Sequence, residues 1–354
     1  MKIGFTLICN SIVVILTLIL YYIPDITPQD FPIGSFLILL IPLFILINLV
    51  FVVIWLIKRS YYNCLLSFVV ILIGYKFIDR SVVIGKSNYP ERDLTVLNCN
   101  VRIFNVYDHL MDKDYNSSKQ MLKWVKNFNA DVACLQEFYS SEVNPIFFTE
   151  IEIKKKFPHS YVAPFLESPL QKFGMAIFSK YPILNKGEIK FRENSNNQII
   201  FADIAVGKVI VRVYNIHLQS MSIDENDIVN SNFDDESRNK WVNILLRYKN
   251  GSIQRGRQID ELVRHIKGCP YKIIVCGDLN EPPYGYAYEE LSDELDNAFQ
   301  KRGNGFGVTY NGKLPLLRID NQFFGKGLKV NKFTIHKEMN YSDHYPISAS
   351  YVFE

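Results

Sequence analysis

Six short stretches place an acid, an amide or an imidazole directly after a run of strand-forming residues. They are Asn98–Arg102, Leu135–Glu137, Asn215–Leu218, Gly277–Asn280, Arg318–Asp320 and Ser342–His344. Each stretch alone is a weak signal, because a strand-terminal Asp or Asn is more often a turn residue. Together they supply hard oxygen ligands and groups that exchange protons near neutral pH. Hydrolysis of a phosphate ester needs such groups to neutralise the phosphoryl oxygens, activate water and assist the leaving oxygen.

In this order the stretches resemble the endonuclease/exonuclease/phosphatase superfamily, which includes deoxyribonuclease I and the neutral sphingomyelinases. The matching segments are LNCNVR (97–102), DVACLQE (131–137), GMAIFSKYPI (174–183), NIHLQ (215–219), GDLNEPP (277–283), RID (318–320) and SDHYPI (342–347). The resemblance covers nearly all of residues 92–354. Its most specific part is the combination of a strand ending in Gln-Glu, a GDxN motif and a C-terminal SDHxP motif.

The resemblance assigns three residues to a metal ion. Glu137 is a hard oxygen ligand of the kind that suits Mg²⁺, which takes one or two carboxylates and keeps several waters. Asn100 and Asp343 are expected to complete or orient this coordination shell. The expected ion is therefore Mg²⁺ (or Mn²⁺), and no organic cofactor is expected.

Five further residues are expected to transfer protons or contact phosphate. His344 is the favoured general base, because imidazole titrates near working pH, and Asp320 matches the family's partner Asp that fixes the tautomer. Asp278 and Asn280 are expected to position the water and contact a phosphoryl oxygen. His217 is expected to contact phosphate or to assist the leaving group. Which histidine is the acid and which is the base stays open.

The sequence departs from the family pattern after the RID motif. The family commonly has a Tyr and then an aliphatic residue there, whereas Asn321 and Gln322 follow here. This change weakens the expectation of an aromatic side chain beside the metal pocket.

The elements that must position these residues are those of a mixed α/β domain. Strands rich in β-branched and aromatic residues are predicted at 94–99, 132–135, 175–179, 199–204, 209–218, 272–276, 318–324 and 347–353. Apolar periodicity predicts helices over 119–128 and around 259–266. The polar stretch 220–256 is predicted to be an accessory loop, partly helical around Trp241–Leu246. The resemblance implies a four-layer α/β sandwich, deoxyribonuclease I-like, preceded by three transmembrane α-helices.

Three N-terminal segments are predicted to span a membrane, at about 3–23, 34–57 and 61–78. About 20 apolar residues cross a bilayer, and none of the segments offers the polar face of a helix in a soluble core. The third segment is the weakest, because it is shorter and has Lys76 near its end. The chain is thus divided into an N-terminal membrane region, 1–87, and a catalytic domain, 88–354.

The loop charges predict the orientation of the membrane region. The loop at 24–32 carries two acids and no cation, whereas Lys58 and Arg59 lie between the second and third spans. The positive-inside rule then places the N-terminus in the cytoplasm and the catalytic domain outside it. The cations that follow the third span argue mildly the other way.

The charge balance argues against a protein that binds long nucleic acid mainly through phosphate contacts. Of the 39 Lys and Arg residues six lie in 1–87, and of the 36 Asp and Glu residues three do, which leaves 33 of each sign in the rest of the chain. Proteins that bind nucleic acid through its phosphates usually have a basic excess. The six cysteines form no CxxC motif, so neither a zinc site nor a disulfide framework is expected.

Together these features predict an integral, multi-pass protein of the cell membrane. Its activity is predicted to be metal-dependent hydrolysis of phosphate esters, as a phosphodiesterase or phosphatase, by in-line attack of water. The substrate stays open among a lipid head group, a small molecule and a nucleic acid, and no protein partner is predicted. An extracytoplasmic DNA or RNA nuclease is one alternative. An inactive, membrane-tethered binding module is another, although the set of acids and histidines is intact.

Overall fold

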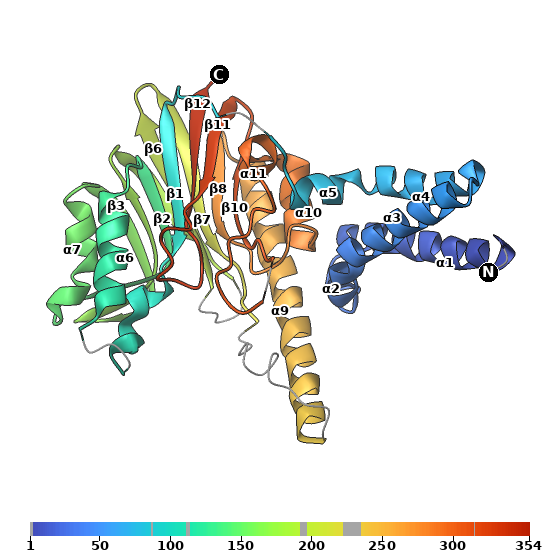
Figure 1. Cartoon of the computed structure of the whole chain (residues 1–354). Coiled ribbons are helices and arrows are strands. Elements are labelled where there is room, and N and C mark those ends of the chain that lie inside the picture. Colours follow the sequence, from blue (N-terminus) through green and yellow to red (C-terminus); the bar gives the residue numbers. More distant parts are fainter. Residues whose placement is uncertain (1–2, 86–87, 111–113, 192–196, 222–234, 315) are drawn as a thin grey trace.

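Two six-stranded sheets pack face to face with helices on their outer surfaces (Figure 1). The computed structural model describes residues 3–85, 88–110, 114–191, 197–221, 235–314 and 316–354. The first sheet has the order β11-β12-β1-β2-β4-β3 and the second has the order β5-β6-β7-β8-β10-β9. This arrangement confirms the predicted α/β sandwich.

The bounds of the strands follow the apolar runs of the sequence. The first sheet comprises β1 Leu94–Asn100, β2 Val132–Ser141, β3 His159–Ser168, β4 Gln171–Ser179, β11 Leu328–Ile335 and β12 Ile347–Phe353. The second comprises β5 Ile183–Ile189, β6 Gln198–Val206, β7 Val209–His217, β8 Lys272–Asp278, β9 Asp296–Asn297 and β10 Asp320–Phe324. All eight predicted strands are present. Strands β3, β5, β9 and β11 were not predicted, and β5 shows why, because its side chains are all exposed or only half-buried at a sheet edge.

Two parallel strand pairs decide where the site lies. β1 pairs in parallel with β2, and β7 pairs in parallel with β8. Parallel neighbours need a crossover connection, which α6 (Asn116–Asn127) provides for the first pair and α9 (Asp235–Lys267) for the second. The carboxyl ends of all four strands therefore lie at one end of the sandwich, which is where α/β proteins commonly build their sites.

Three apolar clusters hold the layers together. One lies between the sheets and includes Val96 and Val213. A second packs α9 and α10 (Tyr286–Glu294) on the second sheet through residues such as Leu262. The third packs α6 on the first sheet through Met121 and Val125, which confirms the apolar stripe predicted for that helix.

The accessory segment is mainly a helix. The helix predicted around Trp241–Leu246 is present, but it is longer than expected, because α9 runs without interruption from Asp235 into the predicted helix around 259–266. Residues 222–234 lie outside the described part of the chain. The start of α9 extends beyond the body of the sandwich, so many of its residues are polar (Figure 1).

The N-terminal helices form a separate bundle beside the sandwich (Figure 1). They are α1 (Ile3–Tyr22), α2 (Gly34–Leu37), α3 (Ile41–Ile57), α4 (Tyr61–Ile73) and α5 (Tyr75–Ser81), with the short 3-10 helices η1 (Ile23–Asp25) and η2 (Ile38–Leu40). The segments Gly4–Asp25 and Gly34–Ile57 are long and apolar enough to cross a membrane. The third apolar stretch is bent by 55° between α4 and α5, so a straight third helix over 61–78 is not what the chain forms. Gly74 lies at the bend, where a Cβ atom would come within 2.1 Å of the Tyr21 hydroxyl.

The polar residues of the apolar segments face one another inside this bundle. Trp55 donates to Asn10 over 2.6 Å, and the Asn10 amide donates to Ser67 over 2.6 Å. Asn48 donates to Thr17 over 2.8 Å. Such hydrogen bonds satisfy polar groups that lipid could not, and they join apolar helices. The outer surface of the bundle remains apolar.

Polar contacts join the bundle to the sandwich. The Arg80 guanidinium donates to both carboxylate oxygens of Glu289 on α10, over 2.6 and 3.2 Å, and both side chains are buried. Gln300 donates to Asp79 over 2.7 Å. The sandwich is thus fixed on the end of the bundle from which α5 emerges.

Candidate active site

Four strands deliver a polar side chain to the same edge of the sandwich. Asn100 ends β1, His217 ends β7 and Asp278 ends β8, while Glu137 lies within β2. His217 and Asp278 are direct neighbours in the parallel register of β7 and β8. The ends of two parallel pairs, one from each sheet, therefore converge on one place.

Glu137 lies at an irregularity of its strand. The register between β2 and β4 shifts between Leu135 and Phe138, and Glu137 has a φ of 49°, which residues with a side chain seldom adopt. At this position its carboxylate oxygen Oε1 accepts a hydrogen bond of 3.1 Å from the Asn100 amide. Strained backbone of this kind is held by the surrounding structure and is common at functional sites.

The GDLN motif makes a tight turn at the end of β8. Gly277 has a φ of 150°, and a Cβ atom there would lie 1.9 Å from the carbonyl oxygen of Ile216 on β7. Only glycine fits such a close approach. Asp278 then accepts a hydrogen bond of 2.8 Å from the backbone N–H of Asn280, whose own amide donates to Leu218 O over 2.9 Å.

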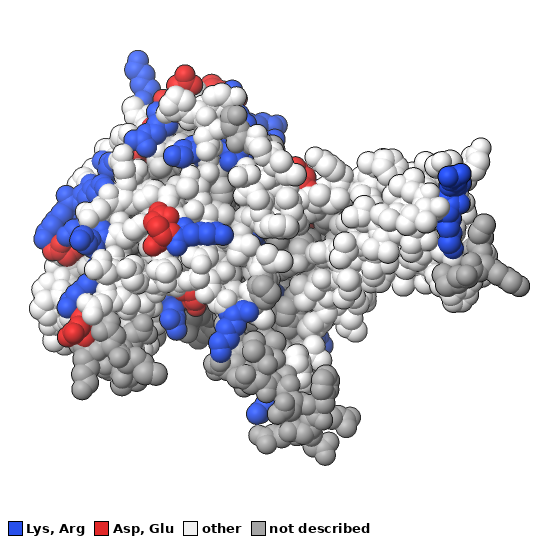
Figure 2. All heavy atoms as spheres, in the orientation of Figure 1, with Lys and Arg blue, Asp and Glu red and all other residues white. Residues whose placement is uncertain are grey.

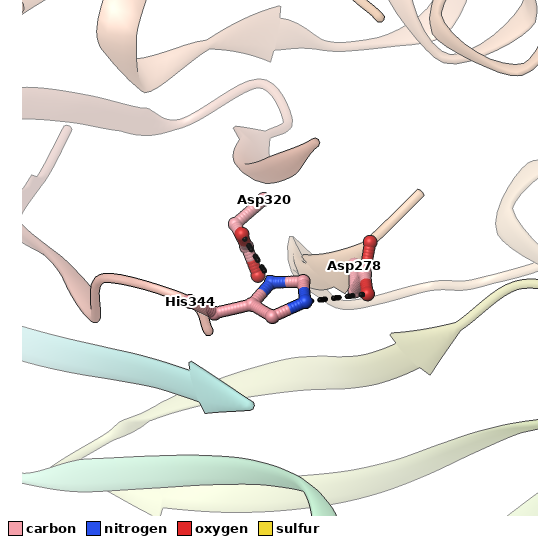
Figure 3. Close-up of side chains that lie close together, drawn as sticks. All are labelled: Asp278, Asp320 and His344. Atoms are coloured by element: carbon pink, nitrogen blue, oxygen red, sulfur yellow. Dashed lines mark hydrogen bonds and ion pairs between the residues drawn. The ribbon is translucent and has the colours of Figure 1, made fainter. Parts of the chain in front are cut away.

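His344 lies between two carboxylates (Figure 3). Its Nδ1 is 2.8 Å from Asp320 Oδ2, and its Nε2 is 3.8 Å from Asp278 Oδ2. An ionised carboxylate only accepts, so Nδ1 carries the proton and Nε2 is the ring atom left to face Asp278. Asp320 and Asp278 are themselves paired across the antiparallel strands β10 and β8.

Burial and charge act in opposite directions on these groups. Burial lowers the pKa of His344, but Asp320 and Asp278 outweigh it and bring that pKa well above its usual value. Burial lowers the pKa of His217, whose Nε2 lies 3.7 Å from Asp278 and 3.9 Å from Glu137. Burial also raises the pKa of Asp278 and of Glu137. The surroundings thus favour the protonated form of His344 and the neutral form of His217.

One cavity of about 460 Å³ joins most of the predicted residues. It is lined at one end by Glu137, His217, Asp278, Asn280, Asp343 and His344. Asn100 and Asp320 stand directly behind it, since Asn100 contacts Glu137 and Asp320 contacts His344. All eight residues predicted from the sequence therefore surround one space, although they come from both sheets.

The sequence model of the Endonuclease/Exonuclease/phosphatase family matches residues 97–344, which is more than half of the chain and contains all eight of these residues. The chain belongs to this family. Members of the family are typically hydrolases that act on phosphate esters, and they generally use divalent metal ions. A second sequence model, described as a domain of unknown function (DUF8431), matches residues 3–81, the N-terminal bundle.

Solved structures of other family members share the fold of the sandwich. An endonuclease/exonuclease/phosphatase from Beutenbergia cavernae DSM 12333 has a TM-score of 0.54 at 14% identity, over 74% of this chain and 72% of that one. A mannosyl-6-phosphatase from Bacteroides thetaiotaomicron VPI-5482 has a TM-score of 0.52 at 14% identity, over 73% of this chain and 100% of that one. Truncated TDP2 from Caenorhabditis elegans has a TM-score of 0.50 at 19% identity, over 74% and 98%. At these identities the likeness concerns the fold alone, and no curated protein matches the chain.

The residues of this family member fit a divalent cation. Glu137, Asp278 and Asp343 offer carboxylate oxygens to the cavity, and no Lys or Arg is among the described residues that line it. Asp278, Asp320 and His344 also bring possible ligand atoms within 4.8 Å of one another. In that second group, however, His344 and Asp320 already form a hydrogen bond with each other. The set around Glu137 is therefore the better site for a hard cation.

Asp343 lies at the rim of the cavity. Its side chain is 39% exposed and lies 3.7 Å from Arg102, which is itself half exposed. Asp343 and Arg102 thus form an ion pair at this rim.

The sequence did not point to Thr309 and Tyr310. The Tyr310 ring packs edge-on against His344 with centroids 5.6 Å apart and lines the cavity. The Thr309 hydroxyl accepts hydrogen bonds from the backbone N–H groups of Ile319 and Asp320. The segment 303–317 has neither strand nor helix periodicity, so no pattern could indicate this role. Tyr310 supplies the aromatic neighbour that the sequence after Asp320 does not.

The departure from the family pattern after Asp320 has a structural use. The Gln322 amide is fully buried and donates to Val96 O and Ile347 O, which belong to the opposite sheet, while it accepts from the Tyr351 hydroxyl. This side chain therefore ties the two sheets together below the site.

Proposed function

We propose that this chain is a membrane-tethered, divalent-metal-dependent hydrolase of phosphate esters. One observation carries the proposal: a buried Asp320–His344 pair meets Asp278, His217 and Glu137 at a single cavity in a domain of this family. The proposed division is a membrane region at 1–87 and a catalytic domain at 88–354.

We propose that Glu137, Asn100 and Asp343 hold a Mg²⁺ or Mn²⁺ ion. When bound, such an ion neutralises charge on the phosphoryl oxygens and supports an attacking water. Asn100 contributes by donating to Glu137, which leaves the other Glu137 oxygen for the cation. The excess of carboxylates around the cavity is the charge that the ion offsets.

The proton transfers are proposed for His344 and His217. Asp320 fixes the His344 tautomer, so Nε2 is the atom that exchanges a proton with the attacking water or the leaving oxygen. His217 contacts the phosphate or the leaving group from the other side of Asp278. Asp278 and Asn280 position the water, and the tight turn of the GDLN motif holds them in place.

We propose three membrane crossings with the catalytic domain outside the cytoplasm. α4 runs alongside α1, because the Asn10 amide on α1 donates to Ser67 on α4, and Gly74 directly after α4 lies against Tyr21 at the end of α1. This supports counting α4 as a crossing despite the bend.

The loop after α1 contacts the sandwich through Gln29, which donates to Asp260 over 3.5 Å, and α5 contacts it through Arg80. Lys58 lies beside Thr6 near the start of α1, at the opposite end of the bundle, and Figure 2 shows basic atoms at the end of the bundle away from the sandwich.

The test is metal-dependent turnover by the full-length protein in detergent. The substrates are bis(4-nitrophenyl) phosphate and 4-nitrophenyl phosphate, with Mg²⁺, with Mn²⁺ or with EDTA. We expect metal-dependent release of nitrophenolate that falls by at least about 10²-fold in His344→Ala and Asp278→Asn.

Glu142→Gln changes an exposed carboxylate outside the cavity and serves as the control. No turnover with either metal, or equal turnover in all variants, contradicts the proposal; rapid cleavage of plasmid DNA instead would favour the nuclease.

A further inference from the structure

The cavity continues beyond the carboxylates along an apolar wall. Two elements far apart in the sequence build this wall, and their lining residues are Phe36 and Leu39 near the start of the second span and Trp241, Ile244, Leu245 and Tyr248 on α9. The same cavity is thus lined by the carboxylates and histidines of the proposed site and by side chains that suit hydrocarbon.

Direct contacts make this wall continuous with the membrane region. The rings of Phe36 and Tyr248 pack with centroids 4.4 Å apart, and the Tyr248 hydroxyl donates to Ser35 O over 2.9 Å. Leu39 belongs to the segment Gly34–Ile57, which is apolar enough to cross a bilayer, and it is 41% exposed. An apolar chain leaving the cavity past Leu39 would therefore enter the lipid.

The free part of α9 also exposes apolar side chains at its surface, and two of them, Val242 and Leu246, lie outside the cavity lining. Trp241, Val242, Leu245 and Leu246 are 37–50% exposed and recur at the i, i+4 spacing of one helical face. In Figure 1, α9 extends across the direction of α1 and α3 on the side of the sandwich that faces the bundle. A helix with such a face beside membrane spans is suited to lie in the bilayer interface, where Trp is enriched.

The charges of the cavity favour a single phosphate over a long polyanion. Among its described lining residues there is no Lys or Arg to neutralise a row of phosphates, and Arg102 at the rim is paired with Asp343. Figure 2 shows the surface of the bundle next to the sandwich almost without charge. This lining is compatible with a single phosphate ester bound with a metal ion, and it lacks the basic side chains that usually hold a nucleic-acid backbone.

We propose that the substrate is a membrane lipid whose phosphate ester reaches Asp278 and His344 while its apolar chain lies between α9 and the start of the second span. This inference rests on the proposed hydrolase function and adds the class of substrate. The substrate enters the cavity laterally from the bilayer. The part of α9 around Leu245 then selects for the apolar chain of the lipid.

The test varies the length of the alkyl chain of the substrate and keeps the leaving group constant. The full-length protein in phosphatidylcholine nanodiscs is given methyl 4-nitrophenyl phosphate or dodecyl 4-nitrophenyl phosphate, which release the same nitrophenolate. If the enzyme prefers monoesters, methyl phosphate and dodecyl phosphate replace them. Each buried methylene is worth about a fourfold gain in kcat/KM, so we expect the dodecyl-to-methyl ratio of kcat/KM to exceed roughly 10².

Two neighbouring leucines provide a matched pair of variants. Leu245 and Leu246 are 48% and 50% exposed, but only Leu245 lines the cavity. Leu245→Glu should lower the dodecyl-to-methyl ratio at least about tenfold, whereas Leu246→Glu should leave this ratio unchanged, because Leu246 does not line the cavity. Partition of the long chain into the nanodisc affects both variants equally. Leu245→Asn replaces Leu245→Glu if the latter does not fold.

The outcomes separate the inference from the proposed function. A ratio near one in the wild type, equal ratios in the two leucine variants, or stronger inhibition of methyl-ester turnover by an oligonucleotide than by a dodecyl ester would overturn the lipid site while hydrolase activity stands. An absence of turnover with every substrate would instead refute the hydrolase function on which the inference rests.

Discussion

Asp320 holds the ring of His344 through a hydrogen bond of 2.8 Å, and both side chains are buried. The second oxygen of Asp320 is buried and has no hydrogen-bond partner among the described residues. Burial lowers the pKa of His344, but the carboxylates of Asp320 and Asp278 outweigh it and raise that pKa well above its usual value, so the ring keeps its proton. The pair is therefore an electrostatic unit, and changing one member alters the other.

Replacement of Asp320 by Asn tests this unit. The amide keeps the shape but removes the charge that raises the pKa of His344, so that pKa should fall and the corresponding limb of the pH–rate profile should move to lower pH. We expect kcat to fall on the order of 10²–10⁴-fold, with a Tm close to that of the wild type. Asp296→Asn, at an exposed ion pair with Lys301, is the control. Unchanged kcat in Asp320→Asn would exclude a role in proton transfer.

Removal of the proposed metal ligand should be visible without any substrate. Mg²⁺ that binds the folded state raises the Tm with the logarithm of its concentration once this exceeds the Kd, and EDTA reverses this effect. We expect Glu137→Gln to need about 10–100 times more Mg²⁺ for the same rise in Tm. Glu142→Gln should behave as the wild type, because its side chain is exposed outside the cavity. Identical Mg²⁺ titrations of the two variants would argue against Glu137 as a ligand.

The turn after β8 should tolerate no side chain at Gly277. Gly277→Ala combines an unfavourable φ with a Cβ atom 1.9 Å from Ile216 O, so we expect the free energy of unfolding to fall by about 2–5 kcal/mol. Gly207 also has a positive φ, of 61°, but nothing lies within 4 Å of its Cβ position. Gly207→Ala should therefore cost only about 1–2 kcal/mol. Denaturant titrations of both variants measure the difference, and equal losses would mean that the close approach to β7 is absent.

The junction between the bundle and the sandwich should weaken at acid pH. Burial raises the pKa of Glu289, but hydrogen bonds and charge from Arg80 and Lys76 outweigh it, so the pKa lies below its ordinary 4.5. A depressed folded pKa gives stability that is present above the unfolded value and is lost as pH falls through the folded value.

We therefore expect Glu289→Gln to lose about 3–5 kcal/mol at pH 7, because the buried Arg80 is left unpaired, and to lose little more on acidification. The Tm measured from pH 7 to pH 3 tests this, with Glu261→Gln at an exposed ion pair as the control. A wild-type Tm that changes with pH as much as that of Glu289→Gln would contradict the assignment.

The topology can be tested by labelling single cysteines in intact cells. In a chain whose partly exposed Cys9, Cys64 and Cys269 are replaced by Ser, Glu142→Cys should react with a membrane-impermeant maleimide from outside. Arg59→Cys should react only after the membrane is permeabilised, because it lies at the cytoplasmic end of the proposed bundle. The opposite pattern would place the sandwich in the cytoplasm.

The sequence by itself determined the class of the fold and pointed to the residues of the proposed site. The types and order of Glu137, Asp278, Asp320 and His344 are local features that follow strand-forming runs, so they can be recognised without coordinates. Apolar length likewise indicated the membrane region, because crossing a bilayer requires consecutive apolar residues wherever they pack. Edge strand β5 and the length of α9 escaped prediction, since their residues carry little of the apolar periodicity that burial imposes.

Only the tertiary structure decided how these pieces meet. Tyr310 and Thr309 reach His344 and Asp320 through an irregular segment whose path depends on packing. The polar residues that interrupt the apolar segments find hydrogen-bond partners only when the helices pack together, as Asn10 does with Ser67. The contact of Phe36 with Tyr248 joins segments more than two hundred residues apart, and no local pattern encodes it. Such contacts arise because distant surfaces are buried together on folding, and burial depends on the whole chain.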